Sequence, residues 1–309
     1  MENQNQTPHK RRVRYKGKYP KKFEEKYKEL QPEKYKDTIE HVIQKGNTPA
    51  GMHISIMVKE IIDFLNIQPG EIGFDATLGY GGHTKAMLKC LNGKGHIYAT
   101  DVDPEESDKT KKRLADQGFG EDLLTVKLQN FCTIDEIAKE VGGFDFILAD
   151  LGVSSMQIDN PKRGFSFKVD GPLDLRLNQD AGISAAERLD TITRDELAGM
   201  LYENSDEPYC EELAKAITDE IRKGNRIDTT TKLRQVIEKT LDFLPEKEKK
   251  DTIKKTCQRT FQALRIDVNR EFEVLYEFME KLPDALRPGA EYECRYHCWG
   301  DSESVVGLV

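Results

Sequence analysis

Apolar residues recur along the chain with two different periods, and each period predicts one type of element. Short apolar runs predict four strands, at residues 72–75, 95–101, 123–128 and 143–150. Apolar residues at helical spacing flank the first strand, at Met57, Ile61, Phe64 and Leu65 before it and at Met87, Leu88 and Leu91 after it. Because strands that alternate with helices are typical of a mainly parallel sheet, we predict an α/β fold.

Past Leu151 the alternation stops for about a hundred residues, and helical spacing takes over. Thr193 followed by Glu196 predicts a capping box at the start of one helix. Apolar stripes predict further helices over 213–221 and 233–241, and the charged stretch 246–255 predicts an exposed connection. Apolar positions from 261 to 275 then predict one long helix, which a Pro288-Gly289 turn ends.

These patterns predict three parts of the chain. Residues 1–50 form a basic, flexible extension, and 51–157 together with 258–309 form the sheet domain. Residues 158–257 form a helical domain inserted into it, which we interpret as the substrate-recognition part. The extension is a solvated arm or makes salt-sensitive contacts to phosphates, because its cations crowd the stretch from Lys10 to Lys22 and Glu2 is the only acid up to Lys22.

Composition narrows the class of protein. The chain has 309 residues and a net charge of −8, and no apolar run approaches the roughly 20 residues of a membrane helix. Its six cysteines are scattered without a Cys-x-x-Cys pair, which disfavours a metal ribbon or a disulfide framework. We therefore expect a reduced, cytoplasmic protein with no membrane partner and no metal.

The stretch from Asp75 to Thr84 carries the first sign of chemistry. Gly79, Gly81 and Gly82 follow the first strand and open a helix, an arrangement that lets a nucleotide-type cofactor approach the backbone. Asp101 ends the second strand, where such folds present an acid to ribose hydroxyls. A nicotinamide cofactor would favour a third glycine at the position of Thr84, so the turn favours S-adenosylmethionine.

The fourth strand ends in Asp150, before a loop of small residues. An acid at this edge can accept a hydrogen bond from an exocyclic amine and so localise its lone pair for methyl transfer, which makes Asp150 our candidate catalytic residue. The alternative is that Asp150 only caps the next turn. No cysteine follows a proline beside these acids, which supports a nitrogen target over a covalent cysteine route.

Several longer blocks resemble the MraW-type enzymes, bacterial methyltransferases that act on cytosine N4 of small-subunit ribosomal RNA. Beyond the glycine turn and the Asp150 loop, the matching blocks are His53-Ile54-Ser55, Asp101-Val102-Asp103-Pro104, Gln157-Ile158-Asp159, Arg163-Gly164-Phe165-Ser166-Phe167, Asp170-Gly171-Pro172-Leu173-Asp174-Leu175-Arg176 and Arg259-Thr260-Phe261-Gln262-Ala263-Leu264-Arg265-Ile266-Asp267-Val268-Asn269. They occur in family order between about 53 and 289.

The resemblance implies a class I methyltransferase fold and S-adenosylmethionine as cofactor. It places the cofactor contacts at Gly81, Gly82, His83, Asp101, Phe131, Asp150 and Gln157. We expect His83 to bind through its backbone amide, with its ring used for packing, and Phe131 to pack against the adenine.

The same resemblance implies a cytidine of the decoding centre in the small ribosomal subunit, and its 16S RNA, as substrate and partner, and allows a homodimer. Arg163, Lys168 and Arg176 would meet phosphates in the loop after the cofactor strand. Arg265 either faces the active site or belongs to a polar flank of its helix. The rivals are a paralogue with another amine target, a weakly active protein that binds ribosome precursors, and a nicotinamide oxidoreductase, which Thr84 disfavours.

The sequence also departs from the family pattern. Tyr80 stands where the family usually has arginine, and Ser205-Asp206-Glu207 replaces Gly-Glu-Glu. From Ala290 the usual second glycine, apolar strand and Ser-Phe-His-Ser motif are missing, and the composition changes abruptly. We hypothesise that the reading frame was altered near codon 290, although the alternating residues from Glu291 to Tyr296 still allow a strand.

Overall fold

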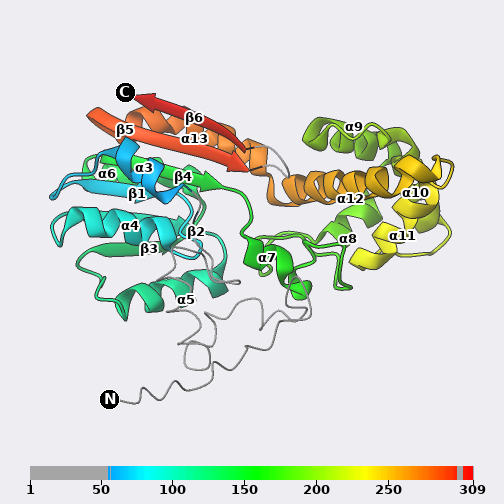
Figure 1. Cartoon of the computed structure of the whole chain (residues 1–309), viewed down its shortest axis with the longest axis horizontal. Coiled ribbons are helices and arrows are strands. Elements are labelled where there is room, and N and C mark those ends of the chain that lie inside the picture. Colours follow the sequence, from blue (N-terminus) through cyan, green and yellow to red (C-terminus); the bar gives the residue numbers. More distant parts are fainter. Residues whose placement is uncertain (1–54, 56, 298–301, 309) are drawn as a thin grey trace, which may run out of the picture. The chain divides into compact units, whose positions relative to one another are not determined.

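The computed structural model describes residues 55, 57–297 and 302–308, so the predicted N-terminal extension lies outside the described residues. Six strands form one sheet, with the bounds β1 (Ile72–Asp75), β2 (His96–Asp101), β3 (Leu124–Leu128), β4 (Phe144–Leu151), β5 (Leu286–His297) and β6 (Ser302–Leu308). Their order is β3-β2-β1-β4-β5-β6, with the first five parallel and β6 antiparallel to β5 (Figure 1). The predicted parallel sheet and its first four strands are confirmed.

Helices cover both faces of the sheet. On one face, α3 (Val58–Leu65), α4 (Gly82–Leu91) and α5 (Pro104–Ala115) share a buried apolar cluster with Phe146 and Leu148. On the other face, α6 (Ile134–Val141) and α13 (Glu271–Ala285) pack with Ile147 and Ala149. Since consecutive residues of β4 thus point to opposite faces and both faces are covered, the strand is apolar almost throughout.

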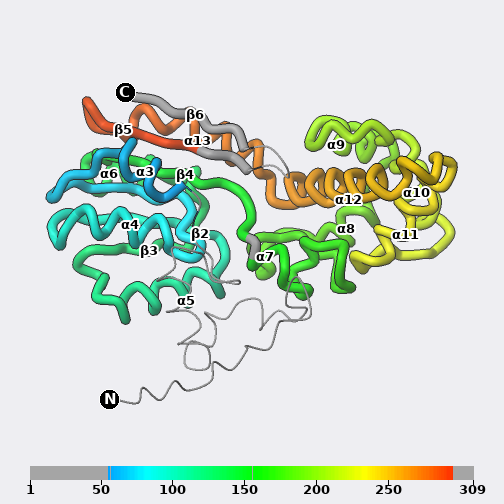
Figure 2. The backbone as a smooth tube through the Cα atoms, in the orientation of Figure 1, coloured from blue at the N-terminus to red at the C-terminus, as the bar shows by residue number. Residues whose placement is uncertain are grey.

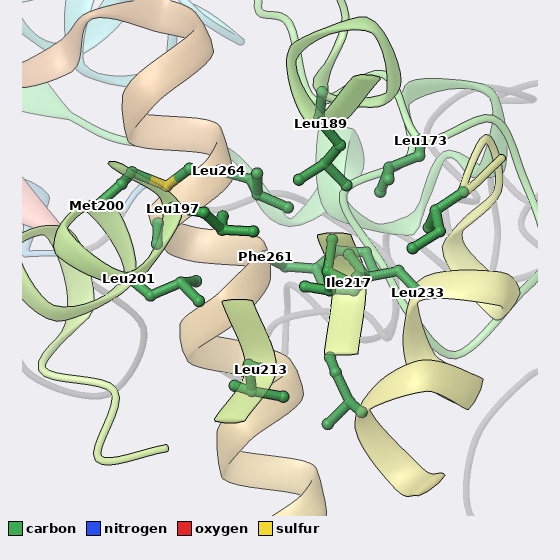
Figure 3. Packing of buried hydrophobic residues seen from close by; sticks show 14 of the residues in the cluster. Leu173, Leu189, Leu197, Met200, Leu201, Leu213, Ile217, Leu233, Phe261 and Leu264 are labelled. Atoms are coloured by element: carbon green, nitrogen blue, oxygen red, sulfur yellow. The ribbon is translucent and has the colours of Figure 1, made fainter. Parts of the chain in front are cut away.

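The segment after β4 is helical. The chain leaves β4 through α7 (Ser155–Asp159) and returns to the sheet through α12 and α13 (Figure 2). The helices of this segment are α8 (Ala185–Thr191), α9 (Arg194–Ser205), α10 (Cys210–Arg222), α11 (Thr230–Thr240) and α12 (Glu246–Asn269). A short 3-10 helix, η3 (Pro161–Arg163), follows α7, and another, η2 (Phe131–Thr133), precedes α6. Leu197, Leu213, Ile217, Leu233 and Phe261 converge in the hydrophobic core of this segment (Figure 3).

Three sequence predictions about the C-terminal third are wrong. The apolar positions from 261 to 275 do not form one helix, because Arg270 adopts a left-handed conformation with φ 51° and separates α12 from α13. The stretch 246–255 is not a connection but the start of α12. Pro288-Gly289 does not end a helix either, since both residues lie in β5 at the irregularity where Phe144 pairs with Leu286 and Phe146 with Glu291.

Within the described ranges, every helix is too short or too polar to cross a membrane.

Candidate active site

The glycine turn joins β1 to α4 and is held in a conformation that favours glycine. Gly79 and Gly81 have φ values of 45° and 70°, and Gly81 is the N-cap of α4. A Cβ on Gly81 would lie 2.8 Å from Cγ2 of Thr110, and one on Gly82 would lie 2.1 Å from Oγ of Ser55. The turn therefore packs too closely for side chains, and the first amides of α4, which have no partner within the helix, suit a carboxylate.

Three acids stand together at the carboxyl edge of the sheet, as the sequence predicted. Asp75, Asp101 and Asp150 end or nearly end β1, β2 and β4, which are neighbours in the order β2-β1-β4. Asp75 pairs in register with Ala99 and Leu148, so Asp101 and Asp150 each lie two residues further along their strands. Parallel pairing thus gathers on one edge residues that are up to 75 positions apart in the sequence.

Asp101 is fixed by the backbone on both sides. Its Oδ2 accepts a hydrogen bond from the Gly79 amide at 2.8 Å, and its Oδ1 accepts one from the Asp103 amide at 2.9 Å. Burial raises the pKa of the Asp101 carboxyl. The acid predicted to meet the ribose is therefore connected directly to the glycine turn predicted to meet the methionine part of the donor.

Asp75, His83 and Asp150 form a compact group of ionisable side chains. Asp75 is 1% exposed, and its Oδ2 accepts a hydrogen bond from Oγ1 of Thr84 at 2.6 Å. Burial raises the pKa of Asp75 to about 6. His83 lies in the first turn of α4, and its Nδ1 is 3.5 Å from Oδ2 of Asp150.

Asp150 does not cap the helix that follows β4. Its backbone oxygen accepts a hydrogen bond from Oγ1 of Thr77 at 2.9 Å. The cap of the next helix, α7, comes from Ser154, whose hydroxyl accepts from the Gln157 amide while the Gln157 side chain accepts from the Ser154 amide. The capping function that the sequence left open for Asp150 is thus performed by Ser154.

The two remaining predicted cofactor residues flank this edge. Phe131 begins η2 and is half-buried, with its ring edge-on to Phe278 at a centroid distance of 5.2 Å. Gln157 lies on α7, and its Nε2 donates to Oδ2 of Asp103 at 3.4 Å. Both side chains keep a partly exposed surface, which suits contact with an adenosyl group.

The four cations predicted to meet RNA have different surroundings. Arg163 is 6% exposed and pairs with Asp103, and Arg265 is 2% exposed and pairs with Glu271 through Nε at 2.8 Å and Nη2 at 3.0 Å. Arg176 pairs with its near neighbour Asp174. Lys168 is exposed and has no ion-pair partner within the described ranges. The structure does not gather these four side chains on one surface.

Asp103 is the residue of the site that the sequence analysis missed. It is 1% exposed, caps α5 through the Glu106 amide, and accepts hydrogen bonds from Gln157 and Arg163. The Asp-Pro pair at 103–104 is a helix-start signal that would have predicted the cap. Nothing in the local sequence predicts its partners, which are 54 and 60 residues away.

A cation from α5 also reaches the glycine turn. The guanidinium carbon of Arg113 lies 4.0 Å from the centre of the Tyr80 ring, and Nη2 donates to the Tyr80 carbonyl at 2.8 Å. Arg113 therefore places a positive charge over the glycine turn at Tyr80.

Comparison with known proteins assigns the chain to a family. The profile of the MraW methylase family matches residues 50–296. The chain belongs to the MraW methylase family. It is thus a methyltransferase with a class I fold, and the family confirms the predicted methyl donor, S-adenosylmethionine.

Relatives of this MraW methylase are similar in sequence to it over most of its length. It is 87% identical over 281 residues to "Ribosomal RNA small subunit methyltransferase H 1" of Agathobacter rectalis, covering 91% of this chain and 80% of the relative. A protein of the same name from Lachnoclostridium phytofermentans is 69% identical, and the match covers 93% of this chain and 78% of that relative. "Ribosomal RNA small subunit methyltransferase H" of Fusobacterium nucleatum is 39% identical, with 77% and 73% covered.

Proposed function

We propose that this methyltransferase modifies the exocyclic N4 amine of a cytidine in the decoding centre of 16S RNA within the small ribosomal subunit. The names of its relatives support the RNA substrate. The nitrogen target is supported by one observation above all, the Asp150 carboxylate, whose side chain is 22% exposed at the carboxyl edge of β4 beside the glycine turn. A carboxylate accepts hydrogen bonds and therefore suits an amine that has hydrogens to donate.

The residues of the edge divide the work of binding and positioning. When bound, S-adenosylmethionine supplies an electrophilic methyl group. The first amides of α4 hold the carboxylate of the donor, Asp101 accepts hydrogen bonds from its ribose hydroxyls, and Phe131 packs against its adenine. Asp150 accepts an N–H of the target amine, which orients the nitrogen lone pair and increases its electron density.

The target base has to leave its stack in the RNA to reach Asp150. We propose that the helical segment 158–257 holds the RNA, because the part of α12 within it carries exposed lysines with no ion-pair partner among the described residues. These are Lys247, Lys250, Lys254 and Lys255. Lys168 adds a further exposed cation in the loop before α8, so phosphate contacts fall to these side chains rather than to the buried Arg163 and Arg265.

The decisive experiment is labelled methyl transfer from S-adenosylmethionine to small subunits that lack the modification, followed by mass spectrometry of the nucleosides. We expect N4-methylated cytidine and no label with Asp150→Asn. Label on another amine would indicate the paralogue. Tight binding of donor and subunit without transfer would indicate the precursor-binding protein. Cytoplasmic location and a homodimer stay predictions.

A further inference from the structure

The His83 ring faces the acid rather than only packing in the core. Nδ1 of His83 and Oδ2 of Asp150 are 3.5 Å apart, and the side chains are 10% and 22% exposed. The Asp150 side chain is therefore the more exposed of the two, and the imidazole is the more buried. The role expected for His83 was donor binding through the backbone amide, with the ring used for packing. That role does not explain why the ring lies beside Asp150.

Two other strands carry ionisable groups that interact electrostatically with this pair. Asp75 from β1 interacts electrostatically with both His83 and Asp150, and it is the most buried of the three carboxyl or imidazole groups. Cys294 of β5, whose register partner on β4 is Ala149, lies within electrostatic range of Asp150, and burial together with that carboxylate raises the pKa of the thiol to about 11. A thiol that holds its proton and a carboxyl already bonded to Thr84 leave the imidazole as the suitable proton acceptor beside Asp150.

We propose that His83 accepts the proton that Asp150 removes from the target amine; this rests on the proposed function. The exocyclic nitrogen forms a bond to the methyl carbon while the carbon–sulfur bond breaks and its electron pair stays on sulfur. The N–H bond then breaks, and the proton passes to the Asp150 carboxylate and on to Nδ1 of the His83 imidazole. Asp150 returns to its anionic form and can accept the next amine.

Proton chemistry explains why an imidazole is useful here. Carboxylates as a class are weak bases at neutral pH, whereas imidazoles as a class ionise close to it, which is the property of an efficient general base. The tautomer that serves this role carries its hydrogen on Nε2, so that Nδ1 presents a lone pair to Asp150. The backbone amide of His83 stays available to the donor in any substitution of the ring.

The test compares His83→Asn with wild type and with His96→Asn. Asparagine keeps a hydrogen-bonding group near the position of Nδ1 but cannot take up the proton. His96 is a matched control because it begins β2, at the opposite edge of the sheet. Its ring forms hydrogen bonds with the Thr125 hydroxyl and the Asp122 carbonyl. The measurements are donor affinity by calorimetry and single-turnover methyl transfer to unmodified small subunits between pH 5.5 and 9.

We expect His83→Asn to bind S-adenosylmethionine within about threefold of wild type and to transfer the methyl group roughly 10²-fold more slowly. Added imidazole should restore part of the transfer rate of His83→Ala, which a purely structural role of the ring would not allow. His96→Asn should match wild type. If His83→Asn shows the wild-type rate and pH profile, or fails to bind the donor, the proton-acceptor role of His83 is overturned. The proposed function is not affected by either result. A wild-type chain that binds the donor but methylates no RNA overturns the proposed function and this proposal with it.

Discussion

Arg163 and Asp103 form a buried ion pair that joins the loop after α7 to the N-terminus of α5. The Arg163 guanidinium also donates to the Leu177 carbonyl at 3.0 Å, while the Asp103 backbone amide donates to Asp101. A side chain that the sequence predicted to meet phosphates thus connects the cofactor edge to the segment expected to hold the substrate. We infer that donor binding and the position of that segment are coupled through this pair.

Replacing Arg163 by alanine should destabilise the protein and weaken donor binding together. Loss of one member of a buried ion pair leaves an uncompensated charge and costs about 3–5 kcal/mol in the free energy of unfolding. Urea unfolding and donor calorimetry measure the two effects. Arg176→Ala is the control, because its pair with Asp174 is local and more exposed. If Arg163→Ala keeps wild-type stability and donor affinity and loses only RNA binding, Arg163 is a phosphate contact after all.

Gly81→Ala should abolish most donor binding. Alanine there has to adopt φ near 70° and places Cβ 2.8 Å from Thr110. Gly93 isolates the two effects, because it has φ 73° with nothing within 4 Å of a Cβ. We expect Gly93→Ala to lose about 1–2 kcal/mol of stability with unchanged donor affinity, whereas Gly81→Ala should lose at least tenfold in affinity. Equal donor affinities in the two variants would contradict the close packing of the turn.

The pH dependence of stability should report Asp75. Because burial raises its pKa to about 6 in the folded state, the folded protein binds the proton more tightly than the unfolded chain. The contribution of this tighter proton binding to the free energy of unfolding is fully present below the pKa of the unfolded chain's aspartate, roughly 4. It is lost as the pH rises through the folded-state pKa of about 6.

Asp75→Asn lacks this titration, so its stability relative to wild type should increase between pH 5 and pH 8, by an amount on the order of 1 kcal/mol. Urea unfolding at the two pH values measures it. The exposed Asp251→Asn is the control and should show no such increase. A difference between Asp75→Asn and wild type that is constant or falls with pH would contradict a buried, protonated Asp75.

Charge reversal on α12 should weaken RNA binding in a salt-dependent way. Lys250→Glu and Lys254→Glu remove cations proposed to neutralise phosphates, and each lost contact should reduce the slope of log affinity against log salt by about 1. Lys94→Glu is the control, since Lys94 is exposed in the loop before β2, at the edge opposite the donor site. Binding to unmodified small subunits at several salt concentrations tests this. Equal slopes in all three variants would locate the RNA elsewhere.

The position of the three acids at one edge of the sheet could be predicted from the sequence, because the information for it is local. Each of β1, β2 and β4 is an apolar run that ends at or just past an acid, and parallel pairing brings the ends of such runs to one edge. The glycine turn was predictable for the same reason. Its close packing against Thr110 explains why only glycine fits at Gly81.

The rest depended on long-range pairing. Arg163 is a cation in an irregular stretch, which is typical of solvent exposure, and its buried ion-pair partner is Asp103, 60 residues earlier. The apolar spacing continues through Arg270, so periodicity alone could not predict the break between α12 and α13. The Arg265–Glu271 ion pair spans that break.

The composition of β5 leads to a prediction about the reading frame of the gene. Glu293 is 3% exposed in β5, between β4 and β6, which is an unusual position for a carboxylate. An altered frame near codon 290 predicts that a neighbouring frame of the gene encodes a second glycine, an apolar strand and Ser-Phe-His-Ser. Resequencing tests this directly. An intact frame with no such tail in either neighbouring frame rejects it.

The central claim is that the Asp150 edge delivers a methyl group to the N4 amine of cytosine. The most direct measurement is the chemical position of label in RNA from unmodified small subunits incubated with the wild-type chain and labelled S-adenosylmethionine. We predict a single N4-methylated cytidine that is absent with Asp150→Asn. Label on a ring carbon or a ribose, or equal label with Asp150→Asn, would contradict it.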